Sequence, residues 1–305
     1  MNSGIKPEIA FIGGGNMASA LISGLVQAGR VPATIAVIEP NDRQRARLAL
    51  QFGVLALPRA DATLAQAKAV VWAVKPQSFV AAAQPCAPHV GGALQLSVMA
   101  GIRTEALVTA TGSPRVVRAM PNTPALIGKG IAGLYATVAV GAADRAMVEQ
   151  VMTPSGELLW VTQERDLDAV TALSGSGPAY VFYFIEAMIQ AAGEMGLSVE
   201  QGRRLALATF AGATALAQQS EDSPAVLRER VTSKGGTTYA ALMSMDNDAV
   251  KAAFVRALHA ACARARQLGE EFGAQAADQA ASAERDPAPR LQIPSHRASG
   301  SREKP

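Results

Sequence analysis

The sequence has few of the residues on which much enzyme chemistry depends. Its 305 residues include three histidines and two cysteines, and Cys86 and Cys262 lie far apart without a metal-binding spacing. The sequence contains no HExxH motif, no cluster of metal ligands and no Ser-His-Asp pattern. We therefore expect a protein that uses no metal and no histidine-based proton transfer. Two isolated cysteines are also typical of a reduced, cytoplasmic protein.

Long apolar runs and strong charge are absent as well. The first residues lack the charged and apolar regions of a signal peptide. Apolar stretches such as 169–185 are interrupted by Ser, Gly and Pro, so we expect no membrane span. The net charge of +3 is not gathered into a basic stripe. We therefore expect neither a membrane nor a nucleic acid as a partner.

Apolar residues are plentiful, at 49%, although aromatic residues make up only 5%. A chain of this length suits two domains. Residues 1–162 alternate strand and helix patterns, which predicts an α/β domain with a mostly parallel sheet and helices on both faces. Residues 163–273 lose the strand pattern and predict an all-helical domain. Residues 274–305 carry few apolar groups, so we expect a disordered tail.

The opening of the chain predicts a dinucleotide site. An apolar run, 9–12, is typical of a buried strand, and Gly13-x-Gly15-x-x-Ala18 follows it directly and leads into a helix pattern. Gly13 permits a tight turn, Gly15 lets the backbone approach a pyrophosphate, and Ala18 lets the helix pack near the strand. The N–H groups at the helix start would then hold the phosphates. A glycine-rich turn in another kind of α/β protein is the alternative.

Glu39, which follows the second predicted strand, bears on the choice of cofactor. An acid here accepts hydrogen bonds from the adenosine ribose and repels a 2′-phosphate, so Glu39 favours NADH. Arg43 and Arg45 lie one turn further on and could instead hold a 2′-phosphate, which would favour NADPH. Glu39 could also be only a surface acid at a helix start. The choice between the two cofactors stays open at this point.

Three further turns follow predicted strands. Because ligands bind at the carboxyl ends of parallel strands, we expect the turns that hold Lys75, Gly101 and Asn122 to line one crevice with Gly13. Lys75 could act as a proton donor. Pro76 follows it, however, and the Lys75 side chain is as well suited to point outward while its backbone contacts the cofactor.

Two polar stretches interrupt the helical domain. Residues 233–238, SKGGTT, place hydroxyl and backbone donors at the start of a helix, which suits a carboxylate. A well-capped turn between two helices is the alternative for this stretch. Residues 171–180, TALSGSGPAY, form a glycine-rich break where a small ligand could contact the backbone.

Taken together, these motifs resemble those of the pyrroline-5-carboxylate reductases, which catalyse the last step of proline synthesis. The resemblance runs from about residue 9 to residue 272, and its most specific part is the block 224–242. It is carried by FIGGGNMA (11–18), AVKPQ (73–77), SVMAGI (97–102), RAMPNTP (118–124), ALSGSGPAY (172–180) and PAVLRERVTSKGGTTYAAL (224–242).

The resemblance implies a Rossmann-type domain and a helical domain that forms an intertwined homodimer, with decamers in some members. It implies that NADPH or NADH and L-1-pyrroline-5-carboxylate meet between the first domain of one subunit and the helical domain of its partner. The residues implied to bind the cofactor are Gly13, Gly15, Asn16, Met17, Ala18, Glu39, Ala73, Val74, Lys75, Pro76, Ala100, Gly101 and Asn122. The implied catalytic residue is Thr171, beside the ring nitrogen, and the implied substrate-binding residues are Ser233, Gly235, Gly236, Thr238 and Glu221.

The sparse inventory of catalytic groups agrees with reduction of a cyclic imine. The ring nitrogen arrives protonated or takes its proton from water, so no strong acid is needed and positioning supplies most of the rate. Two departures from the family pattern, at Glu39 and at Ala60-Asp61, add negative charge near the ribose and favour NADH. The family accepts either cofactor, so the resemblance implies NAD(P)H.

Two other functions compete with this one. A β-hydroxyacid dehydrogenase or another imine reductase would share the two-domain plan, but the former usually has a lysine on the interdomain helix, and no lysine lies between Lys129 and Lys234. A nucleotide-binding regulator without catalysis would not need the intact turn at 233–238 or Thr171.

Overall fold

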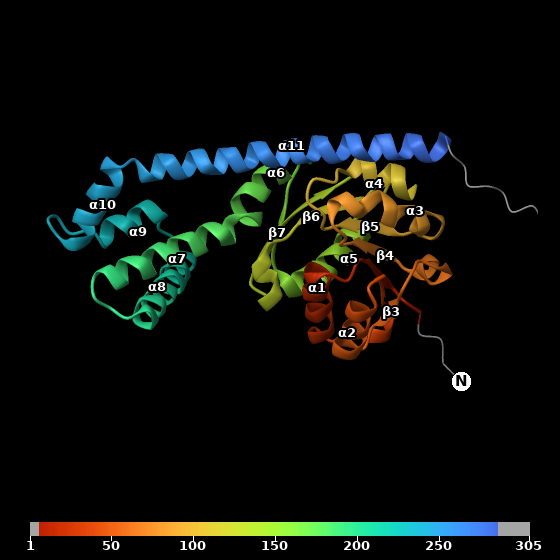
Figure 1. Ribbon diagram of the computed structural model, residues 1–305, viewed down its shortest axis with the longest axis horizontal. Helices are drawn as coiled ribbons and strands as arrows, with labels where there is room; N and C mark the ends of the chain where they lie inside the picture. Colours follow the sequence, from red (N-terminus) through yellow and green to blue (C-terminus); the bar gives the residue numbers. More distant parts are fainter. Residues whose placement is uncertain (1–5, 286–305) are drawn as a thin grey trace, which may run out of the picture.

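The protein has two parts that lie at opposite ends of its longest axis (Figure 1). The computed structural model describes residues 6–285, and for residues 275–285 it describes only the backbone of a helix. The part at the right in Figure 1 holds the sheet, and the part at the left holds helices alone. One helix, α11 (Val250–Arg285), runs along both parts.

An eight-stranded sheet forms the first part, in the order β3-β2-β1-β4-β5-β6-β7-β8. All neighbouring strands run parallel except β6 and β7, which are antiparallel. The predicted mostly parallel sheet is therefore confirmed. The strands are β1 (Ile9–Ile12), β2 (Ile35–Ile38), β3 (Leu55–Leu57), β4 (Ala69–Trp72), β5 (Leu94–Ser97), β6 (Val116–Met120), β7 (Gly130–Ala136) and β8 (Gly156–Trp160).

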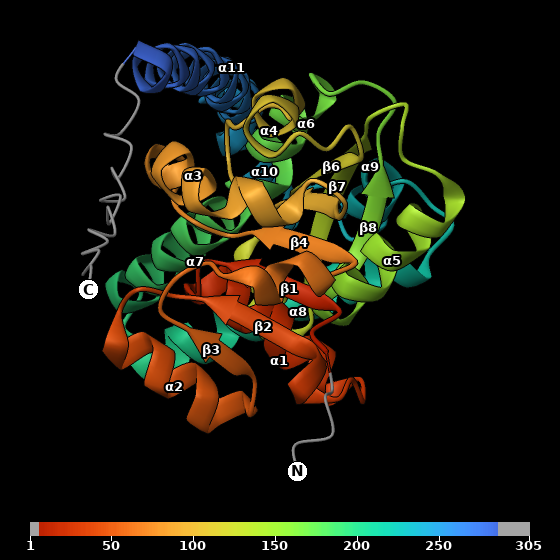
Figure 2. The same ribbon diagram turned by 90° about the vertical axis from the view of Figure 1, so that its right-hand side faces the viewer.

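Helices cover both faces of this sheet, as predicted. Side chains alternate along β1, so that Ile9 and Phe11 join one hydrophobic core while Ala10 and Ile12 join the other. Figure 2 shows α3 and α4 above the sheet and α1 and α2 below it. The first core is covered by α1 (Asn16–Gln27), α2 (Asp42–Phe52) and α5 (Ala142–Met152), and the second by α3 (Phe79–Val90) and α4 (Thr104–Thr111).

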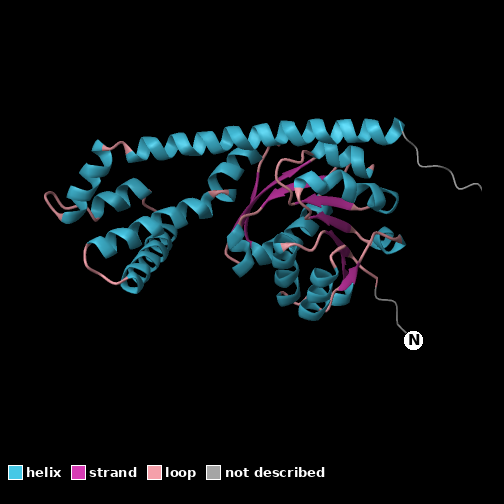
Figure 3. Cartoon of the chain, in the orientation of Figure 1, coloured by secondary structure: helices cyan, strands magenta, loops and turns pink. Residues whose placement is uncertain are grey.

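Between residues 166 and 285 the second part contains helices joined by loops and turns and no strand. Figure 3 shows this helical part beside the sheet. The expected domain boundary at residue 162 falls in the connection between β8 and α6. The helices are α6 (Asp166–Val170), the π-helical turn η6 (Thr171–Gly175), α7 (Gly177–Glu194), α8 (Val199–Gln219), α9 (Pro224–Arg230), α10 (Thr237–Asn247) and α11. Short 3-10 helices in the first part are η1 (Pro32–Thr34), η2 (Ala62–Gln66), η3 (Pro76–Ser78), η4 (Thr123–Ile127) and η5 (Thr153–Ser155).

Helix α11 continues to Arg285, where the sequence predicts a disordered tail from residue 274. The prediction was wrong for residues 274–285. These residues are mostly Ala, Gln, Glu and Arg, which have high helix propensity, and extending an existing helix avoids the cost of starting a new one. Residues 286–305 of the predicted tail lie outside the described residues. Within residues 6–285, no helix combines the length and apolar character needed to cross a bilayer.

Candidate active site

The turn after β1 requires glycine at its first position. Gly13 has a φ of +94°, and a Cβ there would lie 2.8 Å from the Ala73 carbonyl oxygen and 2.9 Å from Val74 Cγ1. The Gly13 N–H donates to the Ile38 carbonyl oxygen at 2.9 Å. The turn after β1 is therefore packed against the turn after β4, and the two form one surface at the carboxyl end of the sheet.

The start of α1 offers backbone donors in an open position. A Cβ on Gly15 would meet no atom within 4 Å, and no side chain caps the helix. Gly15 and Asn16 are exposed, Met17 is half-buried and Ala18 is fully buried against the sheet. The first N–H groups of a helix have no partner within the helix and attract anions. These residues therefore fit a dinucleotide pyrophosphate.

Glu39 turns its carboxylate onto the glycine-rich turn. Its Oε2 atom accepts a hydrogen bond from the Gly14 N–H, and its Oε1 atom accepts one from the Asn41 N–H, both at 2.9 Å. Arg45 donates to the carbonyl oxygens of Glu39 and Pro40 and pairs with Asp42 at 2.6 Å. The negative charge thus sits beside the Gly turn, and the nearby Arg45 guanidinium is already bonded to this loop.

The other turns predicted to bind the cofactor lie at the same end of the sheet. Lys75 is exposed and Pro76 begins η3, so the Lys75 side chain points outward. Ala100 and Gly101 are half-buried after β5. Gly101 has a φ of +75°, and a Cβ there would lie 2.6 Å from Cδ2 of Phe272 on α11. Helix α11 therefore packs directly on the turn after β5.

The turn after β6 joins the sheet to the helical part. The Asn122 side chain donates to the Ser174 carbonyl oxygen at 3.2 Å and accepts from the Ile131 N–H at 3.0 Å. A Cβ on Gly175 would lie 2.7 Å from Met120 Cε, so η6 approaches β6 closely. The structure thus brings the η6 turn, which begins at Thr171, to the carboxyl end of the sheet.

Thr171 stands in a locally unusual helix. Its Oγ1 atom donates to the Leu167 carbonyl oxygen at 2.7 Å, and the residue is half-buried. Residues Thr171–Gly175 form a π-helical turn, a distortion that is often found at functional sites. The Thr171 hydroxyl has used its hydrogen, so its oxygen lone pairs are available to accept one further hydrogen bond.

The predicted substrate residues lie elsewhere in the single chain. Glu221, Ser233 and Gly235 are exposed, and Gly236 and Thr238 are half-buried. They flank α9 and start α10, at the far left of Figure 1, away from the sheet. A Cβ on Gly236 would lie 2.7 Å from Ser233 Oγ, so this turn is tightly folded. One chain alone does not bring this turn to the Gly13 turn.

Four residues that sequence reasoning missed connect the two parts. Glu164 accepts hydrogen bonds from Thr104 and Arg118, and Gly133 lets α6 approach the sheet. A signal was present for Arg118, because a charged residue inside the apolar strand VVRAM needs a buried partner. No comparable signal marks Glu164.

Metal ligands and reactive thiols do not gather at this site. Within the described residues, no group of three or more His, Cys, Asp or Glu side chains is placed to hold a metal ion. Cys86 is buried in the second core, and burial raises the pKa of its thiol to about 11.

Comparison with known proteins decides which family this site belongs to. A pyrroline-5-carboxylate reductase from Pseudomonas aeruginosa is 44% identical over 269 residues, which cover 88% of this chain and 98% of the relative. The chain belongs to the pyrroline-5-carboxylate reductase family. The family model for pyrroline-5-carboxylate reductase dimerisation matches residues 164–268. A second model, described as NADP oxidoreductase, coenzyme F420-dependent, matches residues 8–101.

Solved structures of pyrroline-5-carboxylate reductases share this fold. The structure from Coxiella burnetii is 34% identical, with a TM-score of 0.80, and the match covers 86% of this chain and 98% of that one. The Plasmodium falciparum structure, solved with NADP bound, is 28% identical with a TM-score of 0.78 and the same coverage. The similarity therefore extends over both parts of the chain.

Proposed function

We propose that this chain reduces L-1-pyrroline-5-carboxylate to L-proline with a hydride from NADPH or NADH, as the last step of proline synthesis. The observation that carries the proposal is 44% identity along 98% of a reductase of that name. The geometry adds support, because turns suited to a dinucleotide and the η6 turn with Thr171 meet through Asn122.

The cofactor is proposed to lie across the carboxyl end of the sheet. The first turn of α1 binds the pyrophosphate, and the Glu39 side faces the adenosine ribose. Ala73 to Pro76 lie along the cofactor, with Ala100, Gly101 and Asn122 at the nicotinamide end. When bound, the reduced nicotinamide supplies the hydride, and the residues of the chain hold and orient it.

Thr171 is proposed to orient the ring nitrogen of the substrate. Its hydroxyl already donates to the Leu167 carbonyl oxygen, so it offers a lone pair to the N–H of a protonated imine. The proton is then on the nitrogen before the carbon is reduced, and no histidine or strong acid is required. The contribution of Thr171 is to fix the angle at which the C=N carbon is presented.

A second copy of the chain is proposed to supply the substrate turn in an intertwined homodimer. Apolar side chains on α7 and α8 are exposed in the single chain, including Phe182 at 58%, Tyr183 at 69% and Leu205 at 55%. Burying each such side chain contributes about 1.5 to 3 kcal/mol. The dimerisation model covers these helices. The partner's 233–238 turn would then bind the substrate carboxylate, with Glu221 near its opening.

The geometry of Glu39 favours NADH over NADPH. Its carboxylate accepts hydrogen bonds from the Gly14 and Asn41 N–H groups, so these two donors are not available to a 2′-phosphate. Arg45 is bonded to the loop carbonyls and to Asp42, so of the two arginines the exposed Arg43 alone remains to balance an added phosphate. A nearby carboxylate repels a 2′-phosphate.

A cytoplasmic location is also proposed. Cys86 and Cys262 are both free within the described residues, and free thiols are typical of a reducing compartment.

One assay tests the function directly. Oxidation of NADH and of NADPH is followed with L-1-pyrroline-5-carboxylate. In a separate assay, reduction of NAD+ and of NADP+ is followed with a hydroxy acid. We expect turnover on the pyrroline with both cofactors, better with NADH, and none on the hydroxy acid. Absence of turnover on the pyrroline contradicts the proposal. Light scattering on the same sample measures whether the dimer assembles further into a decamer.

A further inference from the structure

Glu164 joins three elements of the structure with one carboxylate. Its Oε1 atom accepts hydrogen bonds from the Arg118 Nη1 atom at 2.7 Å and from the Thr104 backbone N–H at 2.8 Å. Its Oε2 atom accepts from the Thr104 hydroxyl at 2.8 Å. Glu164 itself lies in the connection between β8 and α6, so the carboxylate ties this connection to β6 and to the start of α4.

The contact is well shielded from water. The Arg118 side chain is 7% exposed and the Glu164 side chain is 20% exposed. Buried charges persist where they are paired and hydrogen-bonded, because each alone would be costly to desolvate. Both carboxylate oxygens of Glu164 have partners, so the arrangement is held in one geometry.

Each of the three elements lies close in sequence to a residue of the proposed active site. Arg118 lies on β6, four positions before Asn122, and Thr104 begins α4, three positions after Gly101. Glu164 lies seven positions before Thr171. The carboxylate therefore links the chain segments that lead to the residues proposed at the nicotinamide end and to the hydroxyl proposed at the ring nitrogen.

The segment that leads from Glu164 to Thr171 has little freedom to move. A Cβ on Gly133 of β7 would lie 2.7 Å from Val170 Cγ1, so α6 rests directly on the sheet. Asp168 is 5% exposed, and its Oδ2 atom, 3.6 Å from Arg103 Nη2, lacks a hydrogen-bond partner within the described residues. A displacement at Glu164 would be passed along this short, packed helix to Thr171.

We propose that Glu164 is a positioning residue for catalysis, which holds the η6 turn with Thr171 in register with the Gly101 and Asn122 turns. The proposal rests on the proposed role of Thr171. Glu164 touches neither substrate nor cofactor in this account. Its loss would shift the Thr171 hydroxyl away from the ring nitrogen while leaving the substrate turn of the partner unchanged.

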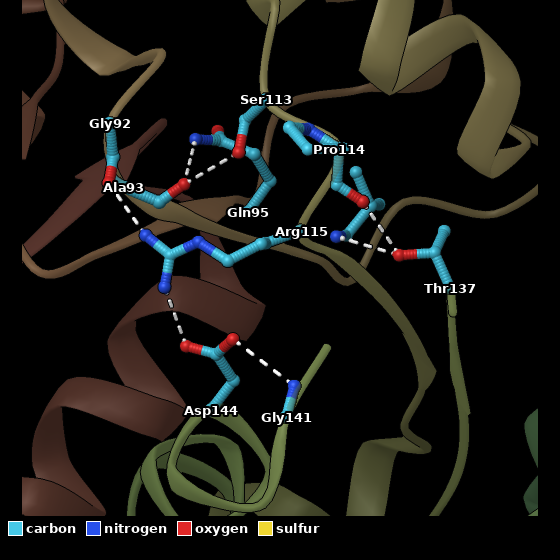
Figure 4. A network of polar contacts seen from close by, with 10 residues as sticks. Gly92, Ala93, Gln95, Ser113, Pro114, Arg115, Thr137, Gly141 and Asp144 are labelled. Atoms are coloured by element: carbon cyan, nitrogen blue, oxygen red, sulfur yellow. Dashed lines mark hydrogen bonds and ion pairs between the residues drawn. The ribbon is translucent and has the colours of Figure 1, made fainter. Parts of the chain in front are cut away.

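A second Arg–carboxylate pair, at the start of the same strand, serves as a control for the loss of a charge pair. Arg115, just before β6, pairs with Asp144 on α5 at 2.7 Å and donates to the Gly92 carbonyl oxygen, as Figure 4 shows. The Asp144 side chain is 16% exposed, close to the 20% of Glu164. This pair lies at the amino end of β6, away from the proposed site, so Asp144→Asn removes a charge pair without touching the contacts of Glu164. The control pair is the more exposed of the two, because the Arg115 side chain is 37% exposed and that of Arg118 is 7% exposed.

The test compares steady-state kinetics of Glu164→Gln and Asp144→Asn in the full-length protein. We expect Glu164→Gln to lower kcat about tenfold or more, because small misplacements of reacting groups are costly, with KM for the pyrroline changed less than about threefold. Asp144→Asn is expected to keep kcat within about twofold of the unmodified protein. Thermal unfolding of both variants shows how much protein is folded at the assay temperature.

A milder variant keeps the test decisive if Glu164→Gln does not fold. Thr104→Val removes the hydroxyl donor and leaves the backbone donor, and we expect a smaller drop in kcat with KM again unchanged. The proposal is overturned if Glu164→Gln keeps the kcat of the unmodified protein, or if both control and test variants lose kcat in proportion to lost stability. If the unmodified protein does not reduce the pyrroline, the proposed function fails instead, whatever the variants do.

Discussion

The Asn122 side chain donates a hydrogen bond to the carbonyl oxygen of Ser174 at 3.2 Å, and so links the sheet to the helical part. The same side chain accepts from the Ile131 N–H, so the amide is held from both sides. Ser174 belongs to the π-helical turn that begins at Thr171. This bond sets the Thr171 hydroxyl at the end of the sheet where the glycine-rich turn lies.

Removal of the Thr171 hydroxyl tests its proposed role. Thr171→Val keeps the shape of the side chain and loses the lone pairs, so we expect kcat to fall about tenfold or more with little change in cofactor affinity. Thr171→Ser, which keeps the hydroxyl, is the control and should retain most of the activity. Stopped-flow and steady-state kinetics measure both. Unchanged kinetics in Thr171→Val would remove this residue from the mechanism.

Replacement of Glu39 tests the choice of cofactor. Glu39→Ser removes the carboxylate beside Gly14, so the ratio of kcat/KM for NADPH to that for NADH should rise about tenfold, or about 1.4 kcal/mol. Glu157→Ser removes an exposed carboxylate from β8, at the opposite edge of the sheet, and should change the ratio much less. A ratio that stays the same in Glu39→Ser contradicts the assignment.

The folded shape of the substrate turn gives a third prediction. Gly236→Ala places a Cβ 2.7 Å from Ser233 Oγ, so Ser233 must move and the proposed carboxylate site is distorted. We expect KM for the pyrroline to rise about tenfold with kcat changed less. Thr238→Ala should act in the same direction. Gly92→Ala, where a Cβ meets no atom within 4 Å, is the control. A loss of kcat alone would argue against a carboxylate site.

Glu164 should also make stability depend on pH. Burial opposes its ionisation, but the Arg118 guanidinium and the Thr104 donors outweigh burial and hold the pKa of Glu164 below its ordinary value of 4.5. A depressed pKa in the folded state gives stability that is complete above the unfolded value and is lost as the pH falls through the folded value. Glu164→Gln should therefore lower the free energy of unfolding by about 1 to 3 kcal/mol at neutral pH.

The difference between the two proteins should shrink as the pH falls below 4.5, the ordinary value. The Arg103–Asp168 pair, next to Thr104 in the sequence, is present in both proteins, so its contribution to the free energy of unfolding cancels in the comparison. Urea unfolding at a series of pH values measures the difference. A difference that stays constant down to about pH 3 would contradict the lowered pKa of Glu164.

The local motifs were enough to predict the first domain. Gly13 has a steric reason to be small, because a Cβ there would lie 2.8 Å from the Ala73 carbonyl oxygen. The alternation of strand and helix patterns along residues 1–162 was enough to predict a mostly parallel sheet. The prediction that the C-terminal part is helical was also confirmed. The end of α11 was missed, because polar, Ala-rich residues resemble a disordered tail unless a helix already leads into them.

Contacts between residues that are far apart in the sequence could not be predicted from local motifs. The Glu164 contact with Arg118 and Thr104 joins residues 46 and 60 positions apart, and no periodicity connects them. The Asn122 bond to Ser174 spans 52 positions. The 233–238 turn, which leads from α9 into α10, is far from the sheet in one chain (Figure 1), and no residue of the turn itself predicts that position.

Subunit complementation tests most directly the central claim, that each site combines the cofactor end of one chain with the substrate turn of another. One variant, Gly15→Glu, blocks the proposed pyrophosphate site. The other, Ser233→Ala with Thr238→Ala, weakens binding of the substrate carboxylate at the 233–238 turn. Each alone should have little activity at a pyrroline concentration well below the KM of the second variant. After random mixing, about half of the dimers carry both variants and one complete site, so about a quarter of the activity should return. If each site lies within one chain, the mixture stays as inactive as its components.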